Sequence, residues 1–136
     1  MKIVLCGSMA FAEKIVYLEK ELVSIGHEPY LNKLVKSYLD LKEEKLKQET
    51  SKNKSKYDLI KVYFEEIKKA DAILVINEEK KGIGGYIGGN VFLEMGFAHV
   101  LDKKIFLLNE IPEVSFKDEI VAMNPVVLNG NLSLIQ

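Results

Sequence analysis

The chain has 136 residues and a formal net charge of −1, and together these exclude several classes of protein. A charge so close to zero gives no general attraction to nucleic acid or to an anionic membrane, so we expect neither as a partner. Apolar residues make up 48% and charged residues 29%, which is a globular composition and not a disordered one. At this length residues 1–136 are predicted to form a single domain.

Cys6 is the single cysteine, so no disulfide can form within the chain and a secreted scaffold is not expected. It lies inside an apolar run, where a small core hydrophobe is a better interpretation than a reactive thiol. No apolar stretch approaches the roughly 20 residues that cross a bilayer. The first residues have the pattern of a strand and not of a signal peptide, and we therefore expect a cytoplasmic protein.

The chain begins with a strand, a turn and a helix. Residues 2–6 form a short β-branched run that ends at Gly7-Ser8. Apolar residues at spacings of three and four then predict a helix over 11–25.

The next stretch is less regular. A short strand over 27–31 is expected at an edge of the sheet, because Pro29 has no amide hydrogen for a ladder. Residues 42–56 are dominated by charged and polar side chains. They are predicted to form a solvated, mobile connection, and a lid over a cleft is the alternative.

The second half of the chain repeats the alternation of helices and strands. Its predicted elements are a helix over 57–69, a strand over 72–76, a glycine-rich loop, a helix over 90–101, a strand over 104–108, a short helix over 116–123 and a strand over 126–128. The run at 72–76 contains no polar residue, which is typical of a central parallel strand. The pattern predicts an α/β fold, a flavodoxin-like three-layer sandwich with a central, mostly parallel five-stranded sheet.

A ligand cleft in such a sheet lies beyond the carboxyl ends of the strands, where the strand order reverses. Three segments are predicted to meet there, namely Gly7-Ser8, residues 77–90 and residues 109–112. Gly7-Ser8 closes a strand and begins a helix, an arrangement that can hold a phosphate or a sugar hydroxyl. Close approach of the backbone to a ligand is one reason for the dense glycines at 82–89.

Glu94 is the residue most suited to chemistry. It lies in the first turn of a predicted helix whose other residues are almost all apolar, so its carboxylate must point at the end of the sheet or lose its hydration. The amino end of that helix favours an anion, either this side chain or a ligand. A glutamate that only complements the helix dipole is the alternative. Asn90 is expected to be the helix N-cap, although its amide can equally face the cleft.

Asp71 is a second candidate. It directly precedes the central strand, at the end of a helix whose dipole disfavours negative charge. A capping or turn-forming role for this aspartate is an equal alternative.

No metal or cofactor is expected. His27 and His99 have no metal-ligand spacing with each other or with Cys6. Neither the Walker spacing nor GxGxxG is present in the glycine-rich loop.

Three segments, in this order, resemble the nucleoside 2-deoxyribosyltransferase superfamily and the allied 2′-deoxynucleoside 5′-phosphate N-hydrolases. They are Cys6-Gly7-Ser8-Met9, then Ala70-Asp71-Ala-Ile-Leu-Val75, then Gly89-Asn-Val-Phe-Leu-Glu94-Met-Gly96-Phe-Ala98. The segment around Glu94 is the specific one. The resemblance implies a flavodoxin-like fold and a nucleoside or nucleotide as the small-molecule ligand. It also implies a homodimer or higher homo-oligomer.

The resemblance further implies an N-glycosidic bond enzyme that forms a glycosyl-enzyme intermediate, as retaining glycosidases do. Glu94 would be the nucleophile, with Asp71 near the base or the sugar. The substrate-binding residues implied are Gly7, Ser8, Met9, Asn77, Gly88, Gly89 and Asn90.

Several alternatives stay open. Phe92 and Asn90 stand where the family's hydrolases have small residues in a phosphate-binding loop, so nucleoside and nucleotide, and transfer and hydrolysis, are not distinguished. The other class of function is a non-catalytic nucleotide-binding or sensing module of the TIR-like or lysine-decarboxylase-like type. Phe92 favours it slightly, since a bulky side chain there narrows the space for a sugar.

Overall fold

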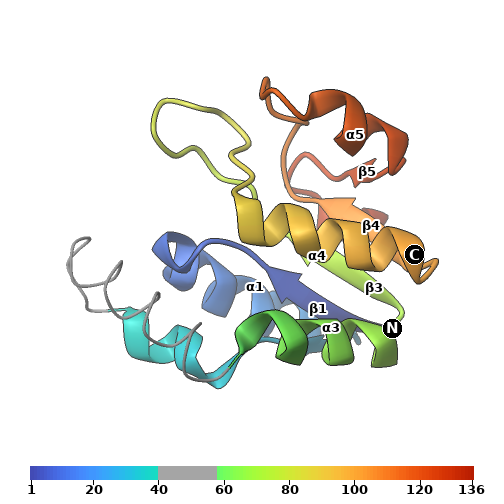
Figure 1. Cartoon of the computed structure of the whole chain (residues 1–136). Helices are drawn as coiled ribbons and strands as arrows, with labels where there is room; N and C mark the ends of the chain where they lie inside the picture. The colour runs from blue at the N-terminus through green and yellow to red at the C-terminus, as the bar shows by residue number, and fades with distance from the viewer. Residues whose placement is uncertain (40–57) are drawn as a thin grey trace.

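In the computed structural model of the chain, residues 1–39 and 58–136 are described. The charged segment 42–56 and its predicted role as a connection or lid lie outside these residues. Helices cover both faces of one sheet, with α3 and α4 in front and α1 behind in Figure 1. No helix in the described ranges is long and apolar enough to cross a bilayer.

The elements follow one another in the predicted order. They are β1 (Lys2–Cys6), η1 (Met9–Phe11), α1 (Ala12–Ser24), β2 (Glu28–Tyr30), η2 (Lys33–Tyr38), α3 (Leu59–Lys69), β3 (Ala72–Val75), α4 (Gly89–Val100), β4 (Lys104–Leu107), α5 (Lys117–Ala122), β5 (Val126–Val127) and η3 (Leu132–Leu134). The predicted strands and helices are confirmed, with their ends shifted by one or two residues.

The sheet has the strand order β2-β1-β3-β4-β5, and each pair of neighbours is parallel. This is the order of flavodoxin-like folds, in which the connections on either side of the reversal leave toward opposite faces of the sheet. The predicted α/β three-layer fold is therefore confirmed. Among the described strands, β2 is the first in the sheet order and pairs with β1 alone, and its Pro29 lies opposite Ile3, so the expected edge position is also confirmed.

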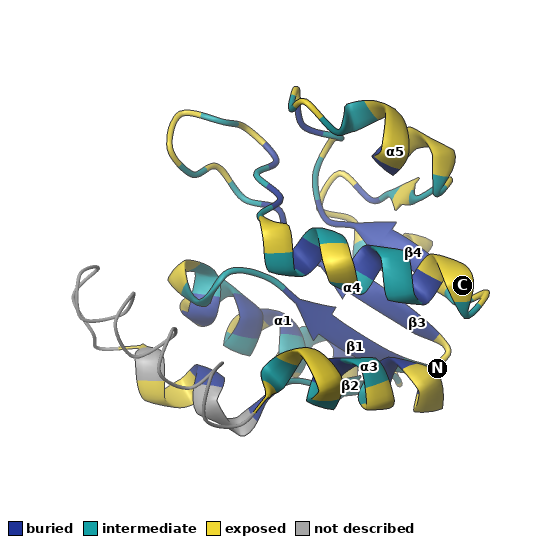
Figure 2. Ribbon diagram, in the orientation of Figure 1, coloured by how far each residue is buried: buried dark blue, intermediate teal, exposed yellow. Residues whose placement is uncertain are grey.

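Strand β1 divides its side chains between two hydrophobic clusters, one on each face. Ile3 and Leu5 pack toward α1, whereas Val4 and Cys6 pack toward α3 and α4. Figure 2 shows the central strands almost entirely in the dark blue of buried residues. The Cys6 side chain is fully buried, in agreement with its interpretation as a core residue, and it faces the layer that carries Glu94.

Candidate functional site

A pocket of about 220 Å³ lies beyond the carboxyl ends of β1 and β3, at the reversal of strand order. Its walls come from the β1–α1 turn, the start of α3, the β3–α4 loop and α4. The sequence-predicted residues that the structure brings together there are Gly7, Ser8, Met9, Gly88, Gly89, Asn90 and Glu94. Asp71 and Asn77 are not among its wall residues.

Helix α4 begins earlier than the sequence suggested. Its N-cap is Gly88 and its first residue is Gly89, so the expectation that Asn90 is the N-cap is wrong. The first turn contains no acidic residue, and Glu94 lies in the second turn, which corrects its predicted position. Because the dipole acts mainly within the first turn, the amino end of α4 favours an anion in the pocket more than it favours the Glu94 carboxylate.

Glu94 lies beside two buried side chains that ionise with difficulty. Burial raises the pKa of the Cys6 thiol well above its usual range, and the charge of Glu94 and the hydrogen bond that the thiol donates to it raise the pKa further. Burial also raises the pKa of Tyr63 well above its usual range, with the charge of Glu94 as the next cause. Both side chains therefore stay neutral at physiological pH, so they do not repel the carboxylate.

Tyr63 forms part of the α3 wall and was missed in the sequence. The helical period shows that this position is buried against the sheet, and Tyr63 belongs to the same hydrophobic cluster as Cys6. Periodicity alone does not reveal that the start of α3, and not residues 109–112, supplies this wall. That depends on how α3 and α4 pack together.

Lys80 is another wall residue that was not singled out from the sequence, although it lies in the segment 77–90 that was predicted to reach the cleft. Its ammonium donates a hydrogen bond to Ser8 Oγ at 3.0 Å and lies 5.3 Å from the centroid of the Tyr86 ring. Lys81 is adjacent and equally basic but does not line the pocket. Only the geometry of the turn distinguishes the two lysines. Among the residues that the structure describes, the pocket wall carries the carboxylate of Glu94 and the ammonium of Lys80.

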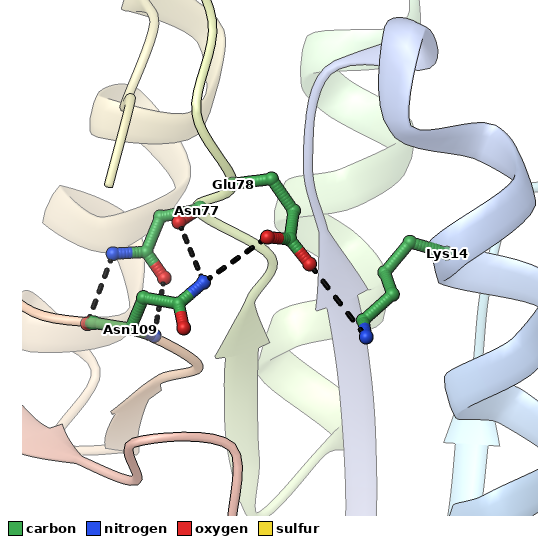
Figure 3. A network of polar contacts seen from close by, with 4 residues as sticks. All are labelled: Lys14, Asn77, Glu78 and Asn109. Atoms are coloured by element: carbon green, nitrogen blue, oxygen red, sulfur yellow. Dashed lines mark hydrogen bonds and ion pairs between the residues drawn. The ribbon is translucent and has the colours of Figure 1, made fainter. Parts of the chain in front are cut away.

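Asn77 is fully buried and faces the neighbouring loop, as Figure 3 shows. Its Nδ2 donates to the backbone oxygens of Asn109 and Glu110, both at 3.0 Å, and its Oδ1 accepts from the Asn109 amide at 2.9 Å. Asn109 Nδ2 in turn donates to the Asn77 carbonyl at 3.0 Å. Both hydrogens of the Asn77 amide are used inside the protein, so its predicted contact with substrate is not supported by this arrangement. The side chain ties the loop after β3 to the loop after β4.

Asp71 lies directly before β3, at the amino ends of the strands, whereas the pocket lies at their carboxyl ends. It is exposed, and its carboxylate accepts a hydrogen bond from the Lys2 amide at 2.8 Å. The four residues of β3 separate it from the pocket edge, a length of about 13 Å at the rise of a strand. This position suits the turn-forming alternative and gives no support to a catalytic role.

Phe92 does not narrow the pocket. Its ring packs against Phe116, with centroids 4.5 Å apart, and it is not a wall residue. The feature that favoured a binding-only module is therefore removed. Among residues 1–39 and 58–136, no group of three or more His, Cys, Asp or Glu is arranged to hold a metal ion.

No family model and no curated protein matches the chain. Among solved structures, it is similar to the CMP N-glycosidase BcmB from Clostridium botulinum. The two chains share 17% sequence identity with a TM-score of 0.55, and the match covers 93% of this chain and 85% of the other. At this identity the likeness establishes a shared fold and no more. Membership of the nucleoside 2-deoxyribosyltransferase superfamily stays a prediction, and this chain is placed by its α/β architecture alone.

Proposed function

We propose that the protein acts on the N-glycosidic bond of a nucleoside or nucleotide, with Glu94 as the nucleophile. The observation that carries this proposal is a carboxylate in the wall of the pocket at the strand-order reversal. Such a group can trap the oxocarbenium-like carbon of a ribosyl substrate. A further support is that a protein of the same fold is a CMP N-glycosidase.

The reaction has two halves. One oxygen of Glu94 bonds to the anomeric carbon while the bond from that carbon to the base nitrogen breaks, and the electron pair leaves with the base, which takes a proton from water. The resulting ester is opened at the same carbon by water, which gives hydrolysis, or by a second base, which gives transfer. Either second half releases Glu94 as a carboxylate.

The neighbours of Glu94 suit this role. Cys6 and Tyr63 stay protonated, because burial and then the charge of Glu94 raise both pKa values. The neutral thiol and phenol leave the Glu94 carboxylate without an anionic neighbour at these two positions. The proposal gives Asp71 no part in catalysis, since its carboxylate accepts a hydrogen bond from the Lys2 amide at the amino ends of the strands, away from the pocket.

The test is release of free base from a panel of ribo- and deoxyribonucleosides and their 5′-monophosphates, followed by chromatography. We expect the wild type to release base from at least one member and Glu94→Gln to be slower by at least about 10³-fold, as for the loss of other nucleophiles. Glu119→Gln makes the same change on the exposed side of α5 and should keep full activity. Wild-type activity in Glu94→Gln would show that the mechanism is wrong.

Intact-mass spectrometry examines the intermediate directly. Wild-type protein mixed with its substrate should gain the mass of one glycosyl group, and Glu94→Gln should not. A binding-only module would instead be stabilised against heat by a nucleotide while releasing no base from any member of the panel. That result would replace the enzyme by the sensing alternative.

A further inference from the structure

The pair Asn129-Gly130 is chemically reactive. It is the one place in the sequence where asparagine precedes glycine, and both residues are exposed. The backbone nitrogen of the glycine can attack the side-chain carbon of the asparagine, because glycine has no side chain that blocks the approach. A bond forms between Gly130 N and Asn129 Cγ, the bond from Cγ to Nδ2 breaks, and ammonia leaves with the proton of the Gly130 amide. Water then opens the resulting succinimide ring to aspartate or isoaspartate.

The fold holds this pair in a conformation that opposes the reaction. Asn129 and Gly130 have φ values of 49° and 79°, and the Asn131 amide donates to the Leu128 carbonyl at 3.0 Å. These are the features of a type I′ turn, for which Asn-Gly is a preferred sequence. In a left-handed residue the nitrogen that follows points away from the side chain, so Gly130 N cannot reach Asn129 Cγ.

The attacking nitrogen is also occupied by a hydrogen bond. The Gly130 amide donates to the Leu108 carbonyl at 2.9 Å, and the Leu128 amide donates to the Leu107 carbonyl at 2.8 Å. Both acceptors lie at the carboxyl end of β4, so the two bonds fasten the turn to the sheet. The reaction therefore requires the turn to leave β4 first, since only then can the Gly130 nitrogen rotate toward the side chain.

The segment that follows the turn is packed on the core by two apolar side chains. In residues 131–136, Ile135 is buried and Leu132 is half-buried, and both pack on the hydrophobic cluster beside α1. The other side chains of this segment are exposed, and the Lys104 ammonium donates to the Gln136 carbonyl. Detachment of the segment uncovers far less apolar surface than unfolding of the sheet, so we expect it to occur more often.

We propose that Asn129 is a site of deamidation that becomes reactive when residues 129–136 detach from β4 and α1. The reaction makes the detachment permanent where isoaspartate forms, because isoaspartate adds one carbon to the main chain between Leu128 and Gly130. The two hydrogen bonds to β4 then no longer fit the spacing of their acceptors. The site is independent of the proposed function, since neither residue of the pair lines the pocket.

The first experiment compares deamidation of Asn129 in the folded protein and in protein unfolded by urea. Mass spectrometry of peptides follows the conversion of amide to acid, and the share of isoaspartate, in mildly alkaline buffer. We expect the folded protein to react at least about tenfold more slowly, because its rate is the unfolded rate multiplied by the open fraction. Asn124 is the internal blank, since the nitrogen of Pro125 has no hydrogen to lose and cannot close the ring. Equal rates in the two states overturn the proposal.

The second experiment separates detachment of the segment from unfolding of the whole protein. Ile135→Ala removes a buried side chain from the segment, and Ile67→Ala removes a buried isoleucine from α3, on the other face of the sheet. In native buffer we expect Ile135→Ala to deamidate at least about tenfold faster than wild type, and Ile67→Ala to stay within about twofold of it.

Melting temperatures verify that these variants are folded, and the milder pair Ile135→Val and Ile67→Val replaces them if either is not. Equal acceleration in both variants would mean that the reaction needs global unfolding, and it overturns the role of the segment. So does a wild-type rate in Ile135→Ala.

The isoaspartate product shows whether the detachment is permanent. After its separation by chromatography, we expect the Leu128 and Gly130 amides to exchange their hydrogens at least about tenfold faster than in wild type, because their bonds to β4 are lost. Exchange as slow as in wild type would mean that the turn docks again, and it would reject the permanent change.

Discussion

Two neighbouring strand ends use their polar residues in opposite ways. After β1, Ser8 lies in the wall of the pocket, bonded to Lys80. After β3, Asn77 turns away from the pocket and gives both amide hydrogens to the backbone of the loop after β4. One end is open toward a ligand, and the other is closed by the protein itself.

The neighbouring strand explains the difference. Strand β3 has β4 beside it, so the chain after β4 brings backbone groups within reach of Asn77. On the other side of β3 lies the reversal, where connections leave toward opposite faces and open space remains. The position of a polar residue relative to the reversal therefore decides its use, and its polarity alone does not.

The largest expected effect on stability comes from removing the Asn77 side chain, which joins the loop after β3 to the loop after β4. Asn77→Ala removes three hydrogen bonds and leaves the backbone groups of Asn109 and Glu110 that it served without a partner. We expect it to lower the free energy of unfolding by about 3 kcal/mol, measured by urea denaturation. Asn109→Ala keeps those backbone groups satisfied and should cost about 1 kcal/mol. Equal losses of unfolding free energy in the two variants would mean that the Asn77 amide is not the group that holds the two loops together.

The closed end also explains one glycine of the loop. A Cβ at Gly85 would lie 2.4 Å from the Glu110 carbonyl oxygen, and its φ of +69° is a value that side chains disfavour. Gly85→Ala should therefore lower the free energy of unfolding by about 2 kcal/mol. Gly84→Ala is the matched control, because a Cβ there meets nothing within 4 Å. Similar melting curves for the two variants would contradict this packing.

A smaller loss of stability is expected at the amino ends of the strands, where Asp71 lies. Asp71→Asn weakens one hydrogen bond from the Lys2 amide at an exposed site, and we expect a loss of about 1 kcal/mol in the free energy of unfolding. Base release should stay at the wild-type rate, because Asp71 is remote from Glu94. A large fall in kcat with normal stability would restore the catalytic role that the sequence suggested.

The fold could be predicted because its signals are local. Uninterrupted apolar runs mark β1, β3 and β4, and helical periods mark α1 and α3. Together with the right-handed crossover rule they leave few sheet topologies. Gly7, Ser8 and Glu94 were located for the same reason, since strand ends and helix starts meet at one edge of a parallel sheet.

The remaining site residues depend on contacts between distant segments. Lys80 and Lys81 are indistinguishable until the turn between Lys80 and Ile83 is known. Asn77 can be assigned only when the loop after β4 is seen beside it. Asp71 is different, because its signal was present in the sequence: it precedes its strand, and residues at the amino ends of parallel strands lie away from the cleft.

The smallest expected effect on stability concerns Cys6, the last residue of β1. Cys6 ends β1, and burial followed by the carboxylate of Glu94 raises the pKa of its thiol, so the folded protein keeps the thiol proton. In the unfolded chain the thiol ionises near a pKa of about 8.5, so unfolding releases a proton above that pH and stability must fall as the pH rises. For one such group the free energy of unfolding should drop by about 0.8 kcal/mol between pH 7 and pH 9. Cys6→Ala lacks the titrating group, so its own urea denaturation curves should show a change smaller by that amount. The same pH dependence in both proteins would mean that the thiol is ionised in the folded state, and Glu94 would then have an anionic neighbour that opposes its use as a nucleophile.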